Sequence, residues 1–172
     1  LESLRGIVGE THVLVGSDLV APYVTDWTRR YTGPCVAVVR PASTQEVSAV
    51  LAVCSAAGQP VLIQGGNTGL VGGSVPASSG LTPVILSTRR LSSIGPVDQL
   101  TGQLTAGAGA LLSAVQTAAD SAGWVYGVDL AARDSATIGG TVATNAGGLN
   151  VIAYGMTRAQ VVGIEAVLAD GT

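Results

Sequence analysis

Hydrophobic and polar positions follow their clearest pattern between residues 35 and 63, where they predict a strand, a helix and a second strand. Residues 35–39 (CVAVV) form an apolar, β-branched run that is typical of a buried strand. A helix should follow, capped by Ser43 or Thr44, with Gly58 just after its end. A short apolar strand at 61–63 then leads directly into a glycine-rich loop. The apolar face of the helix comprises Val47, Val50, Leu51 and Cys54.

The remaining pattern is weaker but predicts elements along the whole chain. Further helices are expected over residues 1–8, 18–30 and 110–122, the last ending at Gly123. Further strands are expected over 83–87, around 103–106 and over 160–169.

Asp170-Gly171 is a strong hairpin-turn signal close to the last residue, Thr172. A hairpin needs a returning strand, so we expect the chain to be a C-terminally truncated part of a longer protein.

The loop at 65–73 offers the first candidate chemistry, because five of its nine residues are glycine. Glycine allows a ligand to approach the backbone closely, and successive N–H groups can converge on an anion. Asn67 and Thr68 add side-chain donors, so the loop suits a pyrophosphate. The spacing alone equally allows a flexible surface turn.

A second segment of small residues, 135–148 (SATIGGTVATNAGG), has a similar character. It offers neutral donors and almost no charge, although small residues also permit close packing of elements. Two such segments in one chain favour a dinucleotide that lies along both.

Composition excludes several classes of function. Hydrophobic residues make up 47% of the chain and charged residues 11%, which is typical of a folded domain. The net charge is −3 and the basic residues are scattered, so no nucleic-acid footprint is visible. The absence of lysine excludes a P-loop and Schiff-base chemistry on lysine. Two cysteines and one histidine provide no zinc spacing and no disulfide framework.

Neither a signal peptide nor an apolar run long enough to span a membrane is visible in the sequence. The cysteines, Cys35 and Cys54, lie in apolar segments and are expected to be buried structural residues. A reducing, cytoplasmic setting is the simplest interpretation.

Other motifs are better explained as structure. Gly107-Ala108-Gly109 resembles a dinucleotide fingerprint, but Leu112 stands where its third glycine is required, which leaves a strand-to-helix turn. His12 is expected at a helix end or strand edge, and Asp129 and Asp134 in cap or turn positions. Trp124 and Tyr126 can line a ring-binding pocket or belong to the core.

Two long segments resemble a known family. Residues 63–76 (IQGGNTGLVGGSVP) and 127–172 are similar to the FAD-linked oxidases of the vanillyl-alcohol-oxidase type. The similarity is strongest to the branch with D-lactate dehydrogenases, D-2-hydroxyglutarate dehydrogenases and the flavin subunit of glycolate oxidase. It also includes 36–61 and extends over about 20–172. It implies an α+β FAD-binding fold of two α+β subdomains with FAD between them.

The same resemblance implies a domain division and a set of cofactor contacts. Residues 1–33 are then a helical lead-in, and 34–172 an incomplete FAD-binding domain. In the family, the loop matching 64–70 wraps the pyrophosphate, the segment matching 129–145 follows the flavin and diphosphate, and a strand near Ile164 passes the adenosine. The implied FAD-binding residues are Gln64, Gly65, Gly66, Asn67, Thr68, Gly69, Leu70, Asp129, Leu130, Ser135, Thr137, Ile138, Gly139, Gly140, Ala143, Thr144, Asn145, Gly148, Gly155 and Ile164.

Three positions depart from the family pattern. Many relatives have a histidine at the position of Asn67 and attach FAD to it covalently, so this chain is expected to hold FAD non-covalently. Val128 replaces a usual proline, and Asp134 stands where glycine is frequent.

The expected activity is oxidation of a D-2-hydroxy acid such as lactate, glycolate or 2-hydroxyglutarate. The family's substrate-binding cap domain and its catalytic and metal residues match nothing in this chain, so no catalytic or metal-binding residue is assigned. The substrate is expected to bind through that cap domain, and the electron acceptor is not defined. The alternatives are a sugar-lactone oxidase, an alkyl-glycerone-phosphate synthase, or a fragment with no activity.

Overall fold

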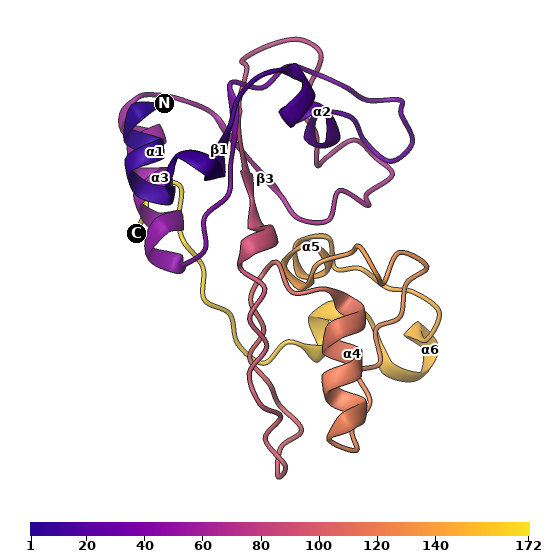
Figure 1. Ribbon diagram of the computed structural model, residues 1–172. Coiled ribbons are helices and arrows are strands. Elements are labelled where there is room, and N and C mark those ends of the chain that lie inside the picture. Colours follow the sequence, from indigo (N-terminus) through magenta and orange to yellow (C-terminus); the bar gives the residue numbers. More distant parts are fainter. The chain divides into compact units, whose positions relative to one another are not determined.

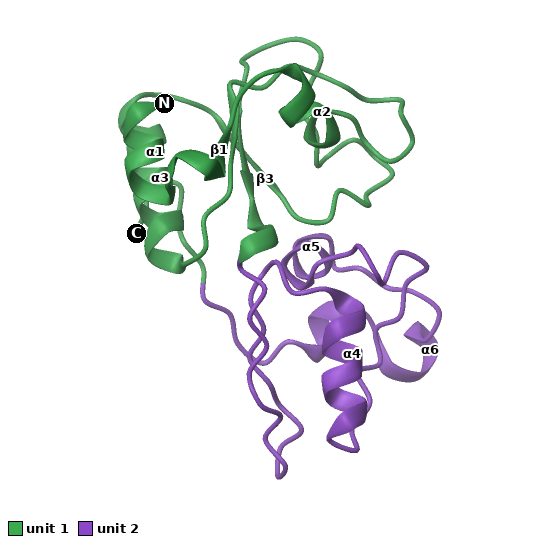
Figure 2. Ribbon diagram, in the orientation of Figure 1, with its two compact units in different colours: residues 1–90, 166–172 green, residues 91–165 purple.

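The computed structural model describes all residues from 1 to 172, which form two compact units (Figures 1 and 2). Unit 1 comprises residues 1–90 and 166–172, and unit 2 comprises residues 91–165. The mixed α+β architecture agrees with the fold expected from the sequence. The division between a lead-in at 1–33 and a domain at 34–172 stays a prediction.

Unit 1 is built on a four-stranded sheet with the order β1-β2-β4-β3. The short β1 (Val13–Leu14) pairs antiparallel with β2 (Ala37–Val39), whereas β2, β4 (Val84–Ser87) and β3 (Val61–Gln64) run parallel. In the register of β3 and β4, Gln64 lies beside Ser87. The carboxyl ends of the parallel strands therefore meet at one edge of the sheet. The strands expected at 35–39, 61–63 and 83–87 are confirmed.

One face of this sheet carries the main core of unit 1. It packs against α1 (Glu2–Val8) and α3 (Thr44–Ala56). A buried Val or Leu side chain contributes about 1.5–3 kcal/mol relative to an exposed one, so this layer is the main source of stability for unit 1. The buried members of this core are Leu4, Val8, Val13, Ala37, Val39, Val50, Leu51, Cys54, Val84 and Leu86.

The helix α3 begins and ends as its sequence predicts. Its N-cap is Ser43, whose Oγ accepts a hydrogen bond of 3.2 Å from the N–H of Glu46. The Glu46 carboxylate in turn accepts a bond of 2.7 Å from the N–H of Ala42. Beyond the helix, Gly58 has a φ of 60°, a backbone conformation that glycine adopts without strain. Both ends are therefore set by local side chains.

The second helix is shorter than the 18–30 expected. The helix α2 spans Ser17–Val24, and the chain then folds into a turn around Asp26. The buried Asp26 carboxylate accepts bonds from the N–H groups of Thr28, Arg30 and Tyr31 and from the Thr28 hydroxyl. In a continuing helix these N–H groups would donate to backbone carbonyls. Because they donate to the Asp26 carboxylate instead, the helix ends before Asp26.

Short 3-10 helices at Glu10–His12 (η1) and Thr88–Arg90 (η2) complete unit 1. His12 ends η1, in agreement with its expected position at a helix end. Cys54 is buried as expected, Cys35 is half-buried, and both are free thiols.

The regular elements of unit 2 are helices, joined by long irregular segments. Its longest helix, α4 (Leu112–Ser121), confirms the helix expected at 110–122 and is followed by Gly123 with a φ of 78°. It buries Leu112, Val115 and Ala119. The other elements are α5 (Ile138–Thr144), α6 (Val151–Tyr154) and a 3-10 helix, η3 (Thr157–Gln160).

The strand expected around 103–106 is present only as one side of an irregular antiparallel arm, the long twisted feature of Figure 1. A single bridge joins Ile94 to Ala106, and the N–H of Gly95 donates to the carbonyl of Thr105 at 2.8 Å. Pro96 lacks an N–H group and interrupts the ladder. The turn at Gly107-Ala108-Gly109 leads into α4, as expected.

The strand expected over 160–169 is not formed. Residues 157–160 are in η3, and the following apolar positions pair with no strand: Val162 is 78% exposed and Ile164 is 73% exposed. An extended segment becomes a strand only when a neighbour accepts its backbone hydrogen bonds. The turn at Asp170-Gly171 is present, with Gly171 at a φ of 92° and a bond of 2.7 Å from the N–H of Leu168 to the carbonyl of Thr172.

Candidate functional site

The glycine-rich loop of unit 1 begins where β3 ends. Ligands of sheets with parallel strands bind at the carboxyl ends of those strands, so residues 65–73 occupy a favourable position. The backbone N–H groups of Gly65, Thr68, Gly69 and Leu70 have no hydrogen-bond acceptor in the protein. The hydroxyl of Thr68 is also unpaired. These groups form a set of neutral donors that a diphosphate can use.

Two predicted donors of the same loop are engaged with the protein instead. The Gln64 side chain is 2% exposed, and its Nε2 donates to the carbonyls of Tyr23 (2.8 Å) and Ser74 (2.6 Å). The Nδ2 atom of Asn67 donates to the carbonyl of Thr25 at 2.9 Å. The Asn67 Oδ1 accepts from the Ser74 hydroxyl at 2.7 Å. Ser74 was not expected in the site, because its partners adjoin it only after folding.

The loop also contains residues that take a left-handed backbone conformation. Asn67 has a φ of 56° and Gly72 a φ of 73°. A Cβ on Gly72 would lie 2.6 Å from the ring of Tyr31, so the loop rests closely on this aromatic side chain. Leu70 and Val71, at 62% and 84% exposed, point into solvent.

The small-residue segment of unit 2 forms α5 and the turns around it. Thr137 caps α5, with its hydroxyl accepting from the N–H of Gly140 at 3.4 Å. The N–H groups of Ile138 and Gly139 donate to the carbonyls of Ala110 (2.9 Å) and Ala108 (2.8 Å). The first turn of α5 therefore has its amide groups satisfied inside unit 2, and contact of this segment with FAD stays a prediction.

Two glycines of this segment are required by close packing. A Cβ on Gly139 would lie 2.8 Å from the Cβ of Ala108. At Gly148, which has a φ of 130°, a Cβ would lie 1.9 Å from the carbonyl oxygen of Asp129. Gly140 has no such conflict, since a Cβ there would lie 3.2 Å from the Thr137 hydroxyl.

The contact at Gly148 brings the segment 129–130 beside the end of the small-residue segment. The carbonyl of Asp129 accepts from the N–H of Leu149 at 2.9 Å. The Asp129 carboxylate forms an ion pair of 3.1 Å with Arg133 and accepts from the Gln116 side chain at 3.4 Å. Asp129 thus has a turn-stabilising role, as its sequence context suggested, and Asp134 is exposed.

The remaining predicted residues of unit 2 are dispersed around α5. Asn145 ends the helix with a φ of 48°, and its Oδ1 accepts from the N–H of Arg158 at 2.9 Å. The Thr144 hydroxyl donates to the carbonyl of Gly140. Ser135, Ala143, Thr144 and Ile164 are exposed, whereas Gly155 is half-buried with a φ of 76°. Trp124 packs on Gly102, and burial raises the pKa of Tyr126.

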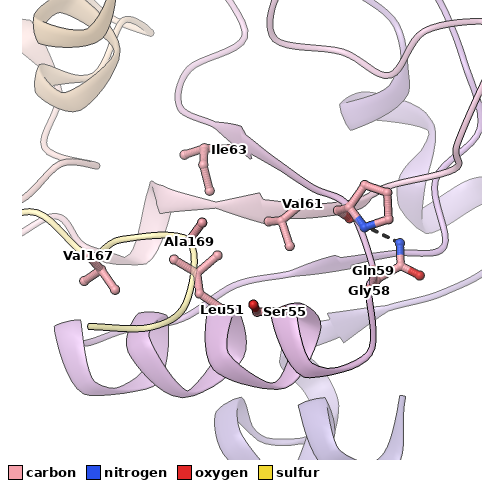
Figure 3. A pocket seen from close by; sticks show the side chains of 9 residues that line it. Leu51, Ser55, Gly58, Gln59, Val61, Ile63, Val167 and Ala169 are labelled. Atoms are coloured by element: carbon pink, nitrogen blue, oxygen red, sulfur yellow. Dashed lines mark hydrogen bonds between the residues drawn. The ribbon is translucent and has the colours of Figure 1, made fainter.

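An open apolar groove of about 500 Å³ lies elsewhere in unit 1, between α3, β3 and the C-terminal segment (Figure 3). Leu51, Val61, Ile63, Val167 and Ala169 line it, together with the polar Ser55 and Gln59. None of the lining residues carries a titratable side chain. Alternation along β3 also directs Val61 and Ile63 to the face opposite Gln64, so the groove is separate from the loop.

Neither unit contains a group of three His, Cys, Asp or Glu side chains able to hold a metal ion. No helix among residues 1–172 combines the length and the apolar character needed to cross a membrane. The loop at 65–73 offers neutral hydrogen-bond donors, which suit the recognition of a bound cofactor. The unpaired N–H groups of the loop fit the diphosphate of FAD.

Comparison with known proteins agrees with this chemistry. A model of the FAD binding domain family matches residues 35–172, and the chain belongs to that family. The chain is 41% identical to a D-2-hydroxyglutarate dehydrogenase of Arabidopsis thaliana over 167 residues, which are 97% of this chain and 29% of that protein. It is 45% identical to a D-2-hydroxyglutarate dehydrogenase of Xanthomonas citri over 149 residues, 87% of this chain and 31% of that protein.

Among solved structures, an alkyldihydroxyacetonephosphate synthase superposes with a TM-score of 0.83 at 18% identity, over 94% of this chain and 31% of that one. This similarity confirms the FAD-binding fold of the vanillyl-alcohol-oxidase type. The chain spans about 30% of the length of the curated relatives that it matches.

One expectation is corrected by these relatives. The sequence suggested a cytoplasmic setting, but the relatives from Arabidopsis thaliana and Bos taurus are named as mitochondrial proteins. Composition and cysteine usage cannot distinguish these compartments, since both keep thiols largely reduced.

Proposed function

We propose that this chain is the FAD-binding part of a dehydrogenase that oxidises a D-2-hydroxy acid to the 2-oxo acid, with D-2-hydroxyglutarate as the first substrate to test. The observation that carries the proposal is the set of unpaired backbone N–H groups at Gly65, Thr68, Gly69 and Leu70, directly after a parallel strand. Relatives at 41–45% identity are named as D-2-hydroxyglutarate dehydrogenases, which supports the substrate class. When bound, FAD would accept a hydride equivalent from C2 of the acid.

The chain's own contribution is to bind and orient the cofactor. The loop N–H groups of unit 1 bind the diphosphate. Hydrogen bonds to a charged group contribute about 1.5–3 kcal/mol each, so three or four of them support tight binding without any basic side chain.

FAD is held non-covalently in this proposal. The Asn67 amide cannot form a covalent bond to the flavin, and its side chain is already hydrogen-bonded to Thr25 and Ser74. Acid precipitation of the holoprotein should release the yellow colour into the supernatant, and colour retained in the pellet would refute non-covalent binding.

The activity must be tested in the complete protein, because the chain matches only about 30% of its relatives. Reduction of an artificial dye is measured with D-2-hydroxyglutarate, D-lactate and the achiral glycolate, with L-2-hydroxyglutarate and L-lactate as controls. Turnover of D-2-hydroxyglutarate is expected. Dye reduction by a sugar lactone alone would replace the proposal with the sugar-lactone oxidase class. Exchange of the acyl group of an acyl-glycerone phosphate for an alkoxy group, followed without dye by the release of the fatty acid, would replace it with the alkyl-glycerone-phosphate synthase class. Residues 1–172 by themselves should bind FAD without turnover.

A further inference from the structure

The residues at the base of the glycine-rich loop are linked to the end of α2 by two side-chain amides. Since α2 ends at Val24, the carbonyls of its last turn have no partner within the helix. The Gln64 amide donates to the carbonyl of Tyr23, and the Asn67 amide donates to the carbonyl of Thr25. These partners are 41 and 42 residues apart along the chain, so the contacts form only in the folded unit.

The same two amides also reach the far end of the loop. Gln64 donates its second N–H to the carbonyl of Ser74 at 2.6 Å, and the Ser74 hydroxyl donates to Asn67 at 2.7 Å. Both N–H atoms of the Gln64 amide are therefore used within the protein. One hydrogen-bonded network thus connects three points of the loop: Gln64, which precedes it, Asn67, which has a left-handed backbone conformation, and Ser74, which follows it.

We propose that Gln64, Asn67 and Ser74 form a clamp that holds residues 65–74 in the shape that binds FAD, and that none of these three side chains contacts the cofactor. The proposal rests on the function proposed above and assigns two of the predicted ligand residues, Gln64 and Asn67, a positioning role. It also adds Ser74, which neither the motif nor the resemblance identified.

The physical basis of the clamp is preorganisation. A glycine-rich segment has more backbone freedom to lose than any other, and a flexible loop would lose it on binding. The clamp has already removed that freedom in the folded protein. The φ of 56° at Asn67 costs little for asparagine, and its side-chain bonds keep the backbone in that conformation.

The test is a double-mutant cycle on FAD affinity, measured by flavin fluorescence in folded protein. Ser74→Ala removes the hydroxyl, and Asn67→Gly removes the amide while tolerating the positive φ. Each change should weaken binding by about three- to tenfold, the equivalent of one or two neutral hydrogen bonds. The double variant should lose less than the product of both, because the two residues share a bond. Ser74→Thr keeps the hydroxyl and should restore affinity, with the bound flavin's visible spectrum unchanged.

The matched control is Ser121→Ala, which removes a serine hydroxyl that donates to a backbone carbonyl in α4 and should leave FAD affinity unchanged. A second measurement needs no cofactor: limited proteolysis should cleave the 65–74 segment faster in Ser74→Ala than in the parent.

Folded single variants that bind FAD as tightly as the parent, or losses that multiply fully in the double variant, would overturn the clamp. So would an unchanged rate of proteolysis. If the parent itself binds no FAD, the proposed function fails, and the proteolysis result still decides whether the clamp exists.

Discussion

The two glycine-rich segments resemble each other in sequence but differ in how their backbone amides are used. In the loop at 65–73, the N–H groups of Gly65, Thr68, Gly69 and Leu70 have no partner. At the start of α5, those of Ile138 and Gly139 donate to carbonyls of unit 2. The first segment keeps its donors available for a ligand, whereas the glycines of the second allow elements to pack closely. Glycine content by itself therefore does not identify a phosphate site.

The largest effect is expected at Gly148, where the packing role is most demanding. Gly148→Ala places a Cβ 1.9 Å from the carbonyl oxygen of Asp129 at a φ of 130°. The backbone must move, so the free energy of unfolding should fall by at least about 3 kcal/mol. Urea denaturation without cofactor measures this loss. The control is Gly163→Ala, where a Cβ meets open space; equal stability of the two variants would contradict the packing role.

The second largest effect is expected for Gly69→Val, which should weaken FAD binding without changing the free energy of unfolding. A Cβ on Gly69 would meet no atom within 4 Å, so Gly69→Val should fold like the parent. Its branched side chain would stand beside unpaired N–H groups and keep a phosphate away from them. The loss of one hydrogen bond to a charged group weakens binding by roughly ten- to a hundredfold.

The matched substitution is Gly73→Val, which also enters open space but lies outside residues 65–70, whose N–H groups are proposed to bind the diphosphate. It should bind FAD like the parent. Equal affinity of Gly69→Val, Gly73→Val and the parent would show that the loop is only a surface turn. Gly140→Val, in the second glycine-rich segment, should affect FAD binding less than Gly69→Val, because the neighbouring N–H groups already have acceptors in the protein.

The elements that were predicted correctly are those with local signals. The cap at Ser43, the apolar face of α3 and the end at Gly58 are all contained within sixteen residues of sequence. The helix expected at 18–30 forms only as far as Val24, because the Asp26 carboxylate binds the backbone N–H groups that follow it. The strand expected at 160–169 failed for a non-local reason, since no neighbouring strand accepts its hydrogen bonds.

The candidate site was predictable only in part, for the same reason. The motif located the loop, but the partners of Gln64 and Asn67 are the carbonyls of Tyr23 and Thr25, which no sequence pattern connects to it. The sequence also could not distinguish a glycine that leaves its N–H free from one, such as Gly139, that permits close packing.

A smaller effect is a pH-dependent stability of unit 1 that unit 2 should lack. The only histidine, His12, lies in unit 1. Burial, with Arg90 and Arg40 nearby, lowers the pKa of His12 from its ordinary value of 6.5, and Glu46 opposes the shift. In its neutral form the ring accepts a bond of 3.3 Å from Arg40. Because the folded pKa lies below the unfolded one, His12 favours folding fully above about pH 6.5, and this contribution is lost as the pH falls through the folded pKa.

Hydrogen exchange at pH 7.5 and pH 5.5 should therefore show unit 1 losing protection at the lower pH more than unit 2. In His12→Gln, whose amide oxygen can accept from Arg40 at every pH, the difference between the units should disappear. An equal loss of protection in both units of the parent would contradict the assignment to His12.

The smallest effect is expected at Ser87, which lies beside Gln64 in the sheet at the base of the loop. Ser87 is 0% exposed, and its hydroxyl has no hydrogen-bond partner. Removal of an unpaired buried hydroxyl relieves its desolvation cost, so Ser87→Ala should leave the stability of the cofactor-free protein unchanged or raise it slightly.

The neighbouring Thr88 provides the matched comparison, because its buried hydroxyl donates to the carbonyl of Gln64 at 3.4 Å. Thr88→Val keeps the shape and should cost about 0.5–1.5 kcal/mol. Urea denaturation of both variants tests the pair, and a loss at Ser87 equal to that at Thr88 would show that Ser87 has a partner in the folded protein. The affinity of Ser87→Ala for FAD is a second measurement at the base of the first glycine-rich segment. If the loop binds the diphosphate through its backbone alone, this affinity should equal that of the parent.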